Sequence, residues 1–328
     1  MQTRLLEKLA CPKCHGELSC SITTTADDGE VEAGSLSCGQ CQQTYPITKG
    51  IPRFVPEENY ATSFGYQWNR FRLEQIDSNN GTRLSTDRLH GETGWTSEWM
   101  KDKWILDAGC GAGRFLDVAV RSGGEVVGLD ISSAIDAAKA NLGDRKNVHF
   151  VQASIFEPPF RTGAFDGCYC IGVIQHTPDP QKAMRALPRT LRSDGQIAIT
   201  AYERKPWTPL YSKYLVRPIT RRLKKTTLLA IIKGVMPVLF PITNVLFKLP
   251  VLGGVFRFTI PIANYANERS LSRQQRYDWA ILDTFDMLSP QYDQPQTQLE
   301  VVHALSSEGI VDLKRIPNAG LNVVGRKG

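Results

Sequence analysis

In this 328-residue chain, the pattern that most clearly predicts a ligand-binding site is an acidic residue followed by three glycines at alternate positions. An apolar run ends at Asp107, and the glycines follow as Gly109, Gly111 and Gly113. Such a run predicts a strand buried on both faces. Glycine lets the backbone turn sharply and approach a ligand closely. A helix over 114–121 would direct its N-terminal amides at that ligand. The pattern predicts a small-molecule site between a strand and a helix.

A second acid indicates the kind of ligand. The short apolar run 126–129 ends at Asp130, about twenty residues after the glycines. A carboxylate there can accept hydrogen bonds from both ribose hydroxyls of a nucleoside. Dinucleotide sites prefer G-x-G-x-x-G, whereas this chain has G-x-G-x-G. The spacing therefore favours a nucleoside ligand other than a dinucleotide.

These residues resemble motif I and the following acid of the Rossmann-like S-adenosylmethionine (SAM) methyltransferases. Later segments resemble further motifs in the family's order: a third strand with its adenine-contacting loop at 150–155, a fourth strand at 165–173, and a turn at 191–195 before a fifth strand at 196–201. The resemblance covers residues 100–202 and implies an α/β fold with a seven-stranded sheet. It also implies SAM contacts from Asp107, Gly109, Gly111, Gly113, Asp130, Ile131, Ser154 and Ile155.

One position departs from the family pattern. An acid usually follows the third strand and bonds the adenine amino group, and this chain has Ser154 there. A hydroxyl can make the same contact more weakly than a charged acceptor. Backbone groups near Ile155 are the alternative for adenine recognition.

Two C-x-x-C pairs near the N-terminus predict a metal site, formed by Cys11, Cys14, Cys38 and Cys41. Tetrahedral zinc takes four thiolates at this spacing, and a site closed by four protein ligands is structural rather than catalytic. A domain this small needs such a metal to stay folded. The alternative is a set of redox-active or merely buried cysteines. Residues 1–56 resemble the small zinc-ribbon activator subunit of tRNA and protein methyltransferases, here fused to its catalytic partner.

The other cysteines have no evident partner, and unpaired thiols beside zinc thiolates indicate a reducing compartment. No signal peptide precedes Cys11, so the sequence predicts a cytoplasmic protein, with the inner face of the membrane as a further location. The net charge of +6 permits contact with anionic surfaces without requiring nucleic acid.

Residues 57–99 are expected to form a lid or linker. The pattern F-G-x-x-W-x-x-F at 64–71 resembles a segment that closes over the methionine half of SAM, and it makes Tyr66 and Trp68 candidates for substrate contact. An aromatic helix packed on the core is the alternative. The polar stretch 77–94 predicts a surface loop with a short helix, from which Arg83, Arg88 and His90 could face the substrate, although single basic residues in such loops are usually solvated.

Residues 203–270 are expected to form a helical apolar insertion after the fifth strand. Within 206–265, a basic cluster at 217–225 precedes a stretch at 228–252 that is apolar around the whole helix. Lysines and prolines interrupt that stretch, so it falls short of the about twenty residues of a membrane span. Three interpretations stay open: a cap over an apolar substrate, an element in the membrane interface with its basic cluster on anionic headgroups, and a homodimer interface.

Residues 271–328 are expected to return to the core. Thr297 and Glu300 have the spacing of a capping box, which predicts a helix ending near residue 307. Short strands at 310–316 and 321–325 would form a terminal antiparallel hairpin.

His176 is the strongest candidate for catalysis, because it follows the fourth strand at the edge where open sheets bind ligands. Histidine as a residue type suits the role of a general base for a hydroxyl or phenol. The alternative is a histidine that only packs or orients loops. Candidates of second rank for the acceptor side are Asp286, Tyr292 and Asp293, with Tyr66 and Trp68.

The segment after the fourth strand also restricts the acceptor. Enzymes that methylate exocyclic base or glutamine nitrogens carry an Asn/Asp-Pro-Pro-Tyr/Phe tetrad there, and this chain reads Gly172-Val173-Ile174-Gln175-His176. The ending resembles small-molecule and lipid O- and C-methyltransferases. We therefore expect SAM-dependent methylation of an apolar or lipid-linked small molecule, most plausibly at oxygen. The alternatives are an RNA methyltransferase that uses the ribbon as its substrate module, and a non-catalytic SAM-binding subunit.

Overall fold

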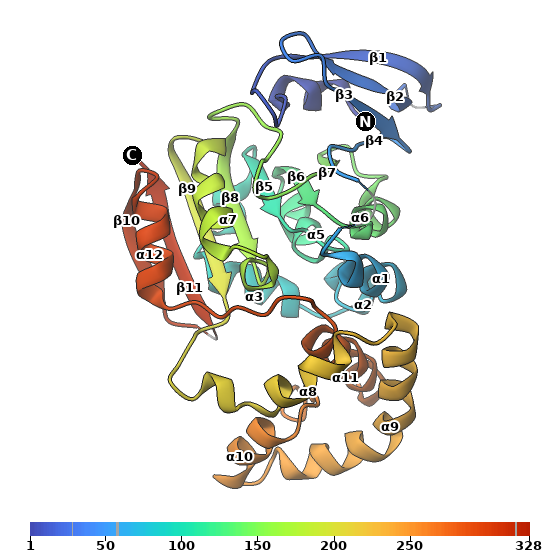
Figure 1. The fold of residues 1–328 in the computed structure, drawn as a ribbon, viewed down its shortest axis with the longest axis vertical. Helices are drawn as coiled ribbons and strands as arrows, with labels where there is room; N and C mark the ends of the chain where they lie inside the picture. The colour runs from blue at the N-terminus through green and yellow to red at the C-terminus, as the bar shows by residue number, and fades with distance from the viewer. Residues whose placement is uncertain (28, 57–58, 319) are drawn as a thin grey trace.

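The computed structural model describes residues 1–27, 29–56, 59–318 and 320–328. Figure 1 shows three parts in a row: a small sheet formed by the N-terminal residues, an α/β core, and a group of helices at the opposite end. The core separates the other two parts.

The small N-terminal sheet, called the ribbon below, is antiparallel throughout. Its strands run in the order β1 (Leu18–Thr25), β2 (Val31–Cys38), β3 (Thr44–Thr48) and β4 (Ile51–Pro52), after a short 3-10 helix, η1 (Thr3–Lys8). Leu5 and Leu9 are fully buried in one apolar cluster with Phe160 of the core. The amide of Ala10 donates to the carbonyl of Pro159 at 3.0 Å. Shared apolar packing and backbone pairing therefore fix the ribbon to the core.

The core sheet has the order β10-β11-β9-β8-β5-β6-β7, which confirms the predicted seven strands. The five strands from β9 to the edge strand β7 are parallel, and β11 lies antiparallel to both of its neighbours. Their bounds are β5 (Trp104–Ala108), β6 (Glu125–Asp130), β7 (Val148–Gln152), β8 (Phe165–Ile171), β9 (Leu191–Ala201), β10 (Ile310–Ile316) and β11 (Leu321–Lys327). Because the strand order reverses beside β5, the carboxyl ends of β5, β6 and β8 border a crevice.

Helices cover both faces of this sheet (Figure 1). One face packs against α3 (Leu84–Thr93), α5 (Arg114–Arg121) and α6 (Ala134–Leu142), and the other against α7 (Pro180–Ala186) and α12 (Gln298–Ser306). The predicted capping box is present at the start of α12. The remaining short elements of the core are α1 (Thr62–Arg70), α2 (Asp77–Asn80), α4 (Ser97–Met100), η2 (Ile174–His176) and η3 (Pro188–Thr190).

Two local predictions differ from the structure. The expected turn at 191–195 is the start of β9, because Leu191 already pairs with Phe165 and the irregularity at Asp194 (φ 61°) is absorbed within the strand. The expected break of the apolar stretch by prolines is also wrong. Pro237 and Pro241 lie inside α9 (Lys225–Leu246), which runs unbroken over 22 residues. Packing of one side of α9 against the protein outweighs the backbone hydrogen bond lost at each proline.

The helical part at the far end contains η4 (Thr208–Leu210), α8 (Ser212–Thr220), α9, α10 (Leu252–Thr259) and α11 (Arg273–Leu288). Buried residues of α9, among them Met236 and Phe240, pack against Phe285 of α11. By length and composition alone, α9 is the one helix among the described residues that could cross a membrane, and a third of its most apolar window is buried in the protein.

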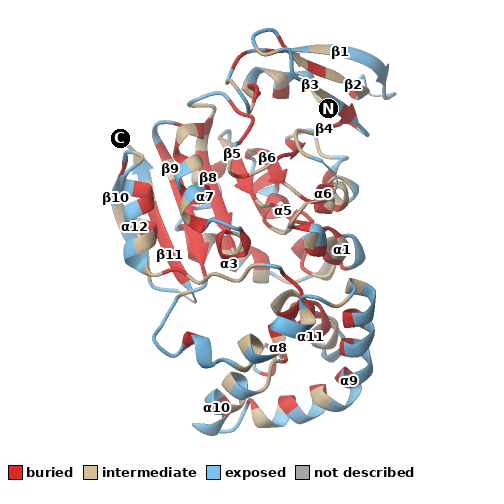
Figure 2. Cartoon of the chain, viewed as in Figure 1, coloured by how far each residue is buried: buried red, intermediate tan, exposed pale blue. Residues whose placement is uncertain are grey.

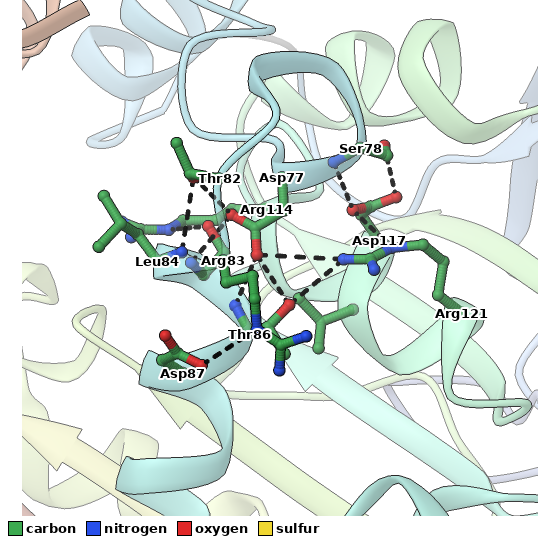
Figure 3. Close-up of polar contacts among 12 residues, drawn as sticks. Asp77, Ser78, Thr82, Arg83, Leu84, Thr86, Asp87, Arg114, Asp117 and Arg121 are labelled. Atoms are coloured by element: carbon green, nitrogen blue, oxygen red, sulfur yellow. Dashed lines mark hydrogen bonds and ion pairs between the residues drawn. The ribbon is translucent and has the colours of Figure 1, made fainter. Parts of the chain in front are cut away.

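The stretch 77–94, expected as a surface loop with a short helix, is ordered by one buried carboxylate (Figure 3). Asp77 accepts hydrogen bonds from the amides of Ser85 (3.0 Å) and Thr86 (2.8 Å) and from the hydroxyls of Thr86 and Thr82. Burial alone would raise the pKa of Asp77, but these hydrogen bonds outweigh it and lower the pKa. The carboxylate thereby joins α2 to the first turn of α3.

Replacement of Asp77 by alanine is expected to lower the free energy of unfolding by about 3 kcal/mol, because two buried amides lose their acceptor. Chemical denaturation at neutral pH measures this loss. Since the folded-state pKa of Asp77 is lowered, its stabilising contribution is present above the unfolded pKa and fades as the pH falls through the folded pKa. The difference between wild type and variant should therefore shrink below about pH 4. Exposed Asp87 is the matched control for this substitution, and an equal loss there would contradict the assignment.

Candidate active site

A cavity of about 860 Å³ opens at the carboxyl ends of the parallel strands. Its floor is made by the loop after β5, the ends of β6 and β8, and Tyr202 after β9. Phe64 and Trp68 of α1 form one wall, and the helical part closes the opposite side with residues such as Tyr211 and Arg257. This volume is typical of a small-molecule site.

The glycine loop is shaped for close approach at two positions. Gly109 (φ +90°) leaves so little room that an added Cβ would lie 2.5 Å from a methyl group of Val173. Gly111 (φ +54°) lies beneath the indole of Trp68, whose nitrogen would be 3.1 Å from an added Cβ. Side chains at either position would displace the cavity wall, so the loop requires glycine here.

Asp130 lies at the end of β6 and lines the cavity. One carboxylate oxygen accepts from the amide of Gly111 at 3.0 Å, and the other from the amide and hydroxyl of Ser132 at 2.8 and 2.7 Å. Burial raises the pKa of Asp130 despite these bonds. The carboxylate is thus held in one orientation between the glycine loop and the start of α6.

Asp107 lies behind the loop and does not line the cavity. Its side chain is buried beside Tyr169, and burial raises the pKa of Asp107 well above its ordinary value. Among the described residues, Oδ2 of Asp107 and the hydroxyl of Tyr169 have no hydrogen bond of normal geometry. These two oxygens form a buried polar pair directly beneath the loop.

His176 lies in η2, just after β8, and lines the same cavity as Asp130. Its Nδ1 lies 3.0 Å from the carbonyl oxygen of Tyr292, so Nδ1 is the nitrogen that donates a proton to that bond. The ring is held between Phe64 (centroids 5.2 Å apart) and Tyr202 (5.5 Å). In the part of the chain that the structure describes, Nε2 has no partner, which leaves its lone pair available in the neutral ring.

A charged wall faces the cavity from α3, α5 and α11. Arg114 donates to the hydroxyl of Ser85 and to the side-chain carbonyl of Gln75, both at 2.9 Å. Burial and nearby Arg88 lower the pKa of Arg114 to about 9. Burial and neighbouring Asp286 raise the pKa of Asp283 to about 7. Burial thus disfavours the charged form of both side chains in this wall.

The four predicted ligand cysteines converge in the ribbon. Their sulfur atoms all lie within 4.8 Å of one another, with Cys11 and Cys41 3.6 Å apart and Cys14 and Cys38 3.4 Å apart. Tetrahedral zinc with thiolate bonds of 2.3 Å requires sulfur separations of about 3.8 Å. The hydroxyl of Tyr45 lies 3.3 Å from the sulfur of Cys11. The arrangement fits a four-thiolate zinc site.

Comparison with known protein families agrees with both sites. Residues 106–199 match the family model described as "Methyltransferase domain", and residues 2–50 match "Trm112p-like protein". The core is a methyltransferase domain. It follows a Trm112p-like domain in the same chain, as the sequence motifs predicted.

The methyltransferase domain resembles curated relatives over part of their length. The chain is 30% identical over 131 residues to the O-methyltransferase resE of Aspergillus sclerotiorum, covering 38% of this chain and 50% of that protein. It is 27% identical over 143 residues to the ubiquinone biosynthesis O-methyltransferase of Aromatoleum aromaticum, covering 42% and 53%. The chain thus spans about half the length of these relatives.

Solved structures match this chain at low identity and with TM-scores below 0.5. The complex of the Haloferax volcanii Trm112 methyltransferase activator with a methyltransferase matches at 13% identity and a TM-score of 0.45, covering 83% of this chain and 98% of that one. Human N-acetylserotonin methyltransferase with SAM matches at 16% identity and a TM-score of 0.42, covering 84% and 60%.

The methyltransferase domain does not bring every predicted contact to the cavity. Gly109, Gly111, Asp130, Ile131 and Ile155 line it, whereas Gly113 begins α5 behind the loop. Ser154, the predicted adenine contact, does not line the cavity. Its hydroxyl accepts from the amide of Phe156 at 3.2 Å and lies outside the lining, because the local turn uses it.

The acceptor-side predictions divide in the same way. Trp68 and Asp286 line the cavity, and Asp286 accepts from Gln67 at 3.0 Å. The other three do not line it. Tyr66 packs on Phe285, Tyr292 contributes its carbonyl to His176, and Asp293 is closed off by Lys213 at 2.7 Å.

Several lining residues had no signal in the sequence. Arg114, Asp283, Tyr202 and Lys213 come from separate segments and meet only in the folded chain. Arg88 was singled out only as one of several basic residues in a polar stretch, and it does face the cavity. A periodic pattern on α11, with acids at 283 and 286 between apolar anchors, is the one clue that could have indicated this wall.

Proposed function

We propose that this chain is a SAM-dependent methyltransferase that methylates a hydroxyl oxygen of an apolar or lipid-linked small molecule. The observation that carries the proposal is one cavity that holds Asp130 and the glycine loop together with the unpartnered Nε2 of His176. The names of the relatives, which are O-methyltransferases, support oxygen as the acceptor atom.

The residues present fit SAM. Asp130 is oriented to accept from ribose hydroxyls, and the apolar side chains of Ile131 and Ile155 are placed for a purine ring. Gly109 lines the cavity without a side chain, so a ligand could lie directly against its backbone. When bound, SAM would supply a methyl group on a positively charged sulfonium, and the indole of Trp68 offers an aromatic face to such a cation.

In this proposal, His176 removes the proton of the acceptor. The carbonyl of Tyr292 holds the proton of the ring on Nδ1, so Nε2 can take a proton from a hydroxyl in the cavity. The rings of Phe64 and Tyr202 keep the imidazole in place. The cavity would also accelerate methyl transfer by holding the acceptor oxygen in line with the methyl carbon.

The ribbon has a structural part in the proposal, with zinc held by its four cysteines. Lys8 of the ribbon lies over Trp104, the first residue of β5, whereas the cavity lies at the other ends of the strands. None of the described residues that line the cavity belongs to the ribbon. This separation weighs against the alternative of an RNA methyltransferase whose ribbon presents the substrate.

We also propose a reducing, cytoplasmic location, because each of the eight cysteines is free. The segment boundaries 1–56, 57–99, 100–202, 203–270 and 271–328 stay predictions.

The helical part contributes Tyr211 and Arg257 to the cavity wall, as expected for a cap over the substrate.

Methyl-labelled SAM and an extract of the source organism test the proposal. After incubation with the purified chain, the extract is separated into lipid, small-molecule, protein and RNA pools. Label in the lipid or small-molecule pool is the expected result, and it also supplies the acceptor for identification. Label confined to RNA would overturn the proposal in favour of the nucleic-acid enzyme.

His176→Gln is expected to lower turnover by about 100-fold or more, because the variant cannot accept the proton. The affinity for SAM, measured by equilibrium dialysis, should stay unchanged. A matched control is His303→Gln on the exposed side of α12, which should retain full turnover. Equal turnover in both variants would show that His176 only packs.

A further inference from the structure

The helical part carries a charge distribution unlike the rest of the chain. Residues 204–267 contain eleven lysines and arginines and no aspartate or glutamate. Since the whole chain has 39 basic and 33 acidic residues, the remainder has more acidic than basic residues. The excess positive charge of the protein is therefore concentrated in this one part.

Some of these cationic side chains form hydrogen bonds within the fold. The guanidinium of Arg217 is buried and donates to the carbonyls of Met287 and Pro290 at 2.8 and 2.9 Å. Lys225 donates to the carbonyl of Ser289 at 2.9 Å. Other cations are exposed and have no side-chain partner among the described residues: Arg222, Lys224, Lys233 and Lys248.

The long helix α9 is apolar on two opposite sides. Its inner side, with Ile232, Met236 and Phe240, is buried against α11. Its outer side carries a second apolar stripe at intervals of three and four residues, formed by Ile231, Val235, Val238, Ile242 and Val245. Val238 and Val245 are each about three-fifths exposed (62% and 61%). A stripe at this spacing lies on one face of a helix.

The exposed apolar surface continues beyond α9. Leu215 and Ile219 project from α8, and Leu252 and Val255 from α10, while Val251 between α9 and α10 is 92% exposed. Figure 2 shows these helices at the end of the molecule remote from the ribbon, with exposed residues along α9 and α10. Scattered single apolar residues on a protein surface are ordinary, but this many on neighbouring helices indicate an interaction surface.

We propose that this outer surface of α8, α9 and α10 binds the surface of an anionic lipid bilayer, with α9 lying in the plane of the interface. Apolar side chains flanked by exposed lysine and arginine are the combination that such a surface recognises, since the apolar groups enter the acyl boundary and the cations meet the headgroups. The inner side of α9 stays committed to α11, so the helix lies on the bilayer rather than across it.

The same observations weigh against two other partners. A two-fold dimer through this surface would bring two copies of the same positively charged patch face to face. A nucleic acid would meet the cations but would leave the apolar stripe of α9 in water. Only an anionic bilayer satisfies both the charge and the apolar area. Because Tyr211 and Arg257 of the same part line the cavity, docking would bring the cavity close to the lipid.

Flotation of the full chain with lipid vesicles tests the proposal without SAM, so its outcome is separate from that of the methyl-transfer assay. The chain should float with vesicles of phosphatidylcholine and phosphatidylglycerol, and much less with phosphatidylcholine alone. The double variant Arg222→Glu/Lys224→Glu should lower the partition constant at least about 30-fold. The matched control Lys146→Glu/Lys314→Glu, which alters exposed lysines of the core, should leave it unchanged.

A second pair of variants tests the apolar stripe. Val238→Glu/Val245→Glu should abolish flotation, whereas Leu299→Glu, at an 81% exposed leucine of α12, should not. All of these positions are exposed, so the variants are expected to melt like wild type. The proposal is overturned if the chain floats with neither vesicle, or if both stripe and control variants bind equally. It is also overturned if RNA binds in place of vesicles, or if Val238→Glu/Val245→Glu dissociates a dimer and leaves flotation intact.

Discussion

Replacement of Asp130 by alanine is expected to raise the dissociation constant for SAM by at least about 100-fold, because two hydrogen bonds to a charged acceptor are lost. Asp130 faces the cavity and is oriented by Gly111 and Ser132, so no other side chain can take its place. Equilibrium dialysis with labelled SAM measures the change. Methyl transfer to any acceptor should fall in parallel, since the cofactor no longer binds.

The controls for this variant separate binding from folding. Asp144→Ala removes an exposed carboxylate from the same domain and should leave the affinity unchanged. Asp130→Asn keeps one acceptor oxygen, for the amide of either Gly111 or Ser132, so it should fold more stably than Asp130→Ala and still bind SAM weakly. Unchanged affinity in Asp130→Ala would exclude this cavity as the SAM site.

Replacement of Cys38 by serine is expected to reduce bound zinc from one equivalent per chain to a small fraction of that. Structural zinc contributes about 10–16 kcal/mol of apparent binding energy in small zinc domains, so the ribbon should unfold without it. The damage should reach the core, because Leu5 and Leu9 share a buried cluster with Phe160. We expect the melting temperature to fall by more than about 10 °C.

Cys20→Ser is the matched control for the metal site. Cys20 lies in β1 of the same ribbon, half-buried and outside the cluster of four sulfurs. Metal analysis by mass spectrometry and thermal melts should show full zinc and an unchanged melting temperature for this variant. Purified wild-type protein without zinc, but with a folded ribbon, would contradict the assignment.

The core could be predicted largely from local patterns. Buried parallel strands appear in the sequence as short apolar runs, and the acids and glycines that follow β5 and β6 come at fixed distances from those runs. The cysteine pairs are equally local, because zinc ligands come from two short segments. The capping box at Thr297 is confirmed for the same reason, since both partners lie within one helical turn.

Prediction was weaker wherever a residue's role depends on distant neighbours. The hydroxyl of Ser154 is used by Phe156 in its own turn, and Asp293 is neutralised by Lys213, eighty positions away. Pro237 and Pro241 stay within α9 because tertiary packing on α11 outweighs their local cost. Asp77 joins two helices where the sequence predicted a surface loop with one short helix, since its partners are recognisable only once the chain has folded.

By itself the sequence determined the class of fold, the four-cysteine site and the carboxylate and glycines at the head of the cavity, because each depends on residues close together in the chain. Only the tertiary structure decided which walls the acceptor meets. Arg114 and Asp283 come from two separate elements, and they meet in one cavity because α11 and the rest of the helical part pack over the sheet's carboxyl edge. Contacts between distant segments depend on how the elements pack, so the spacing of residues in the sequence does not predict them.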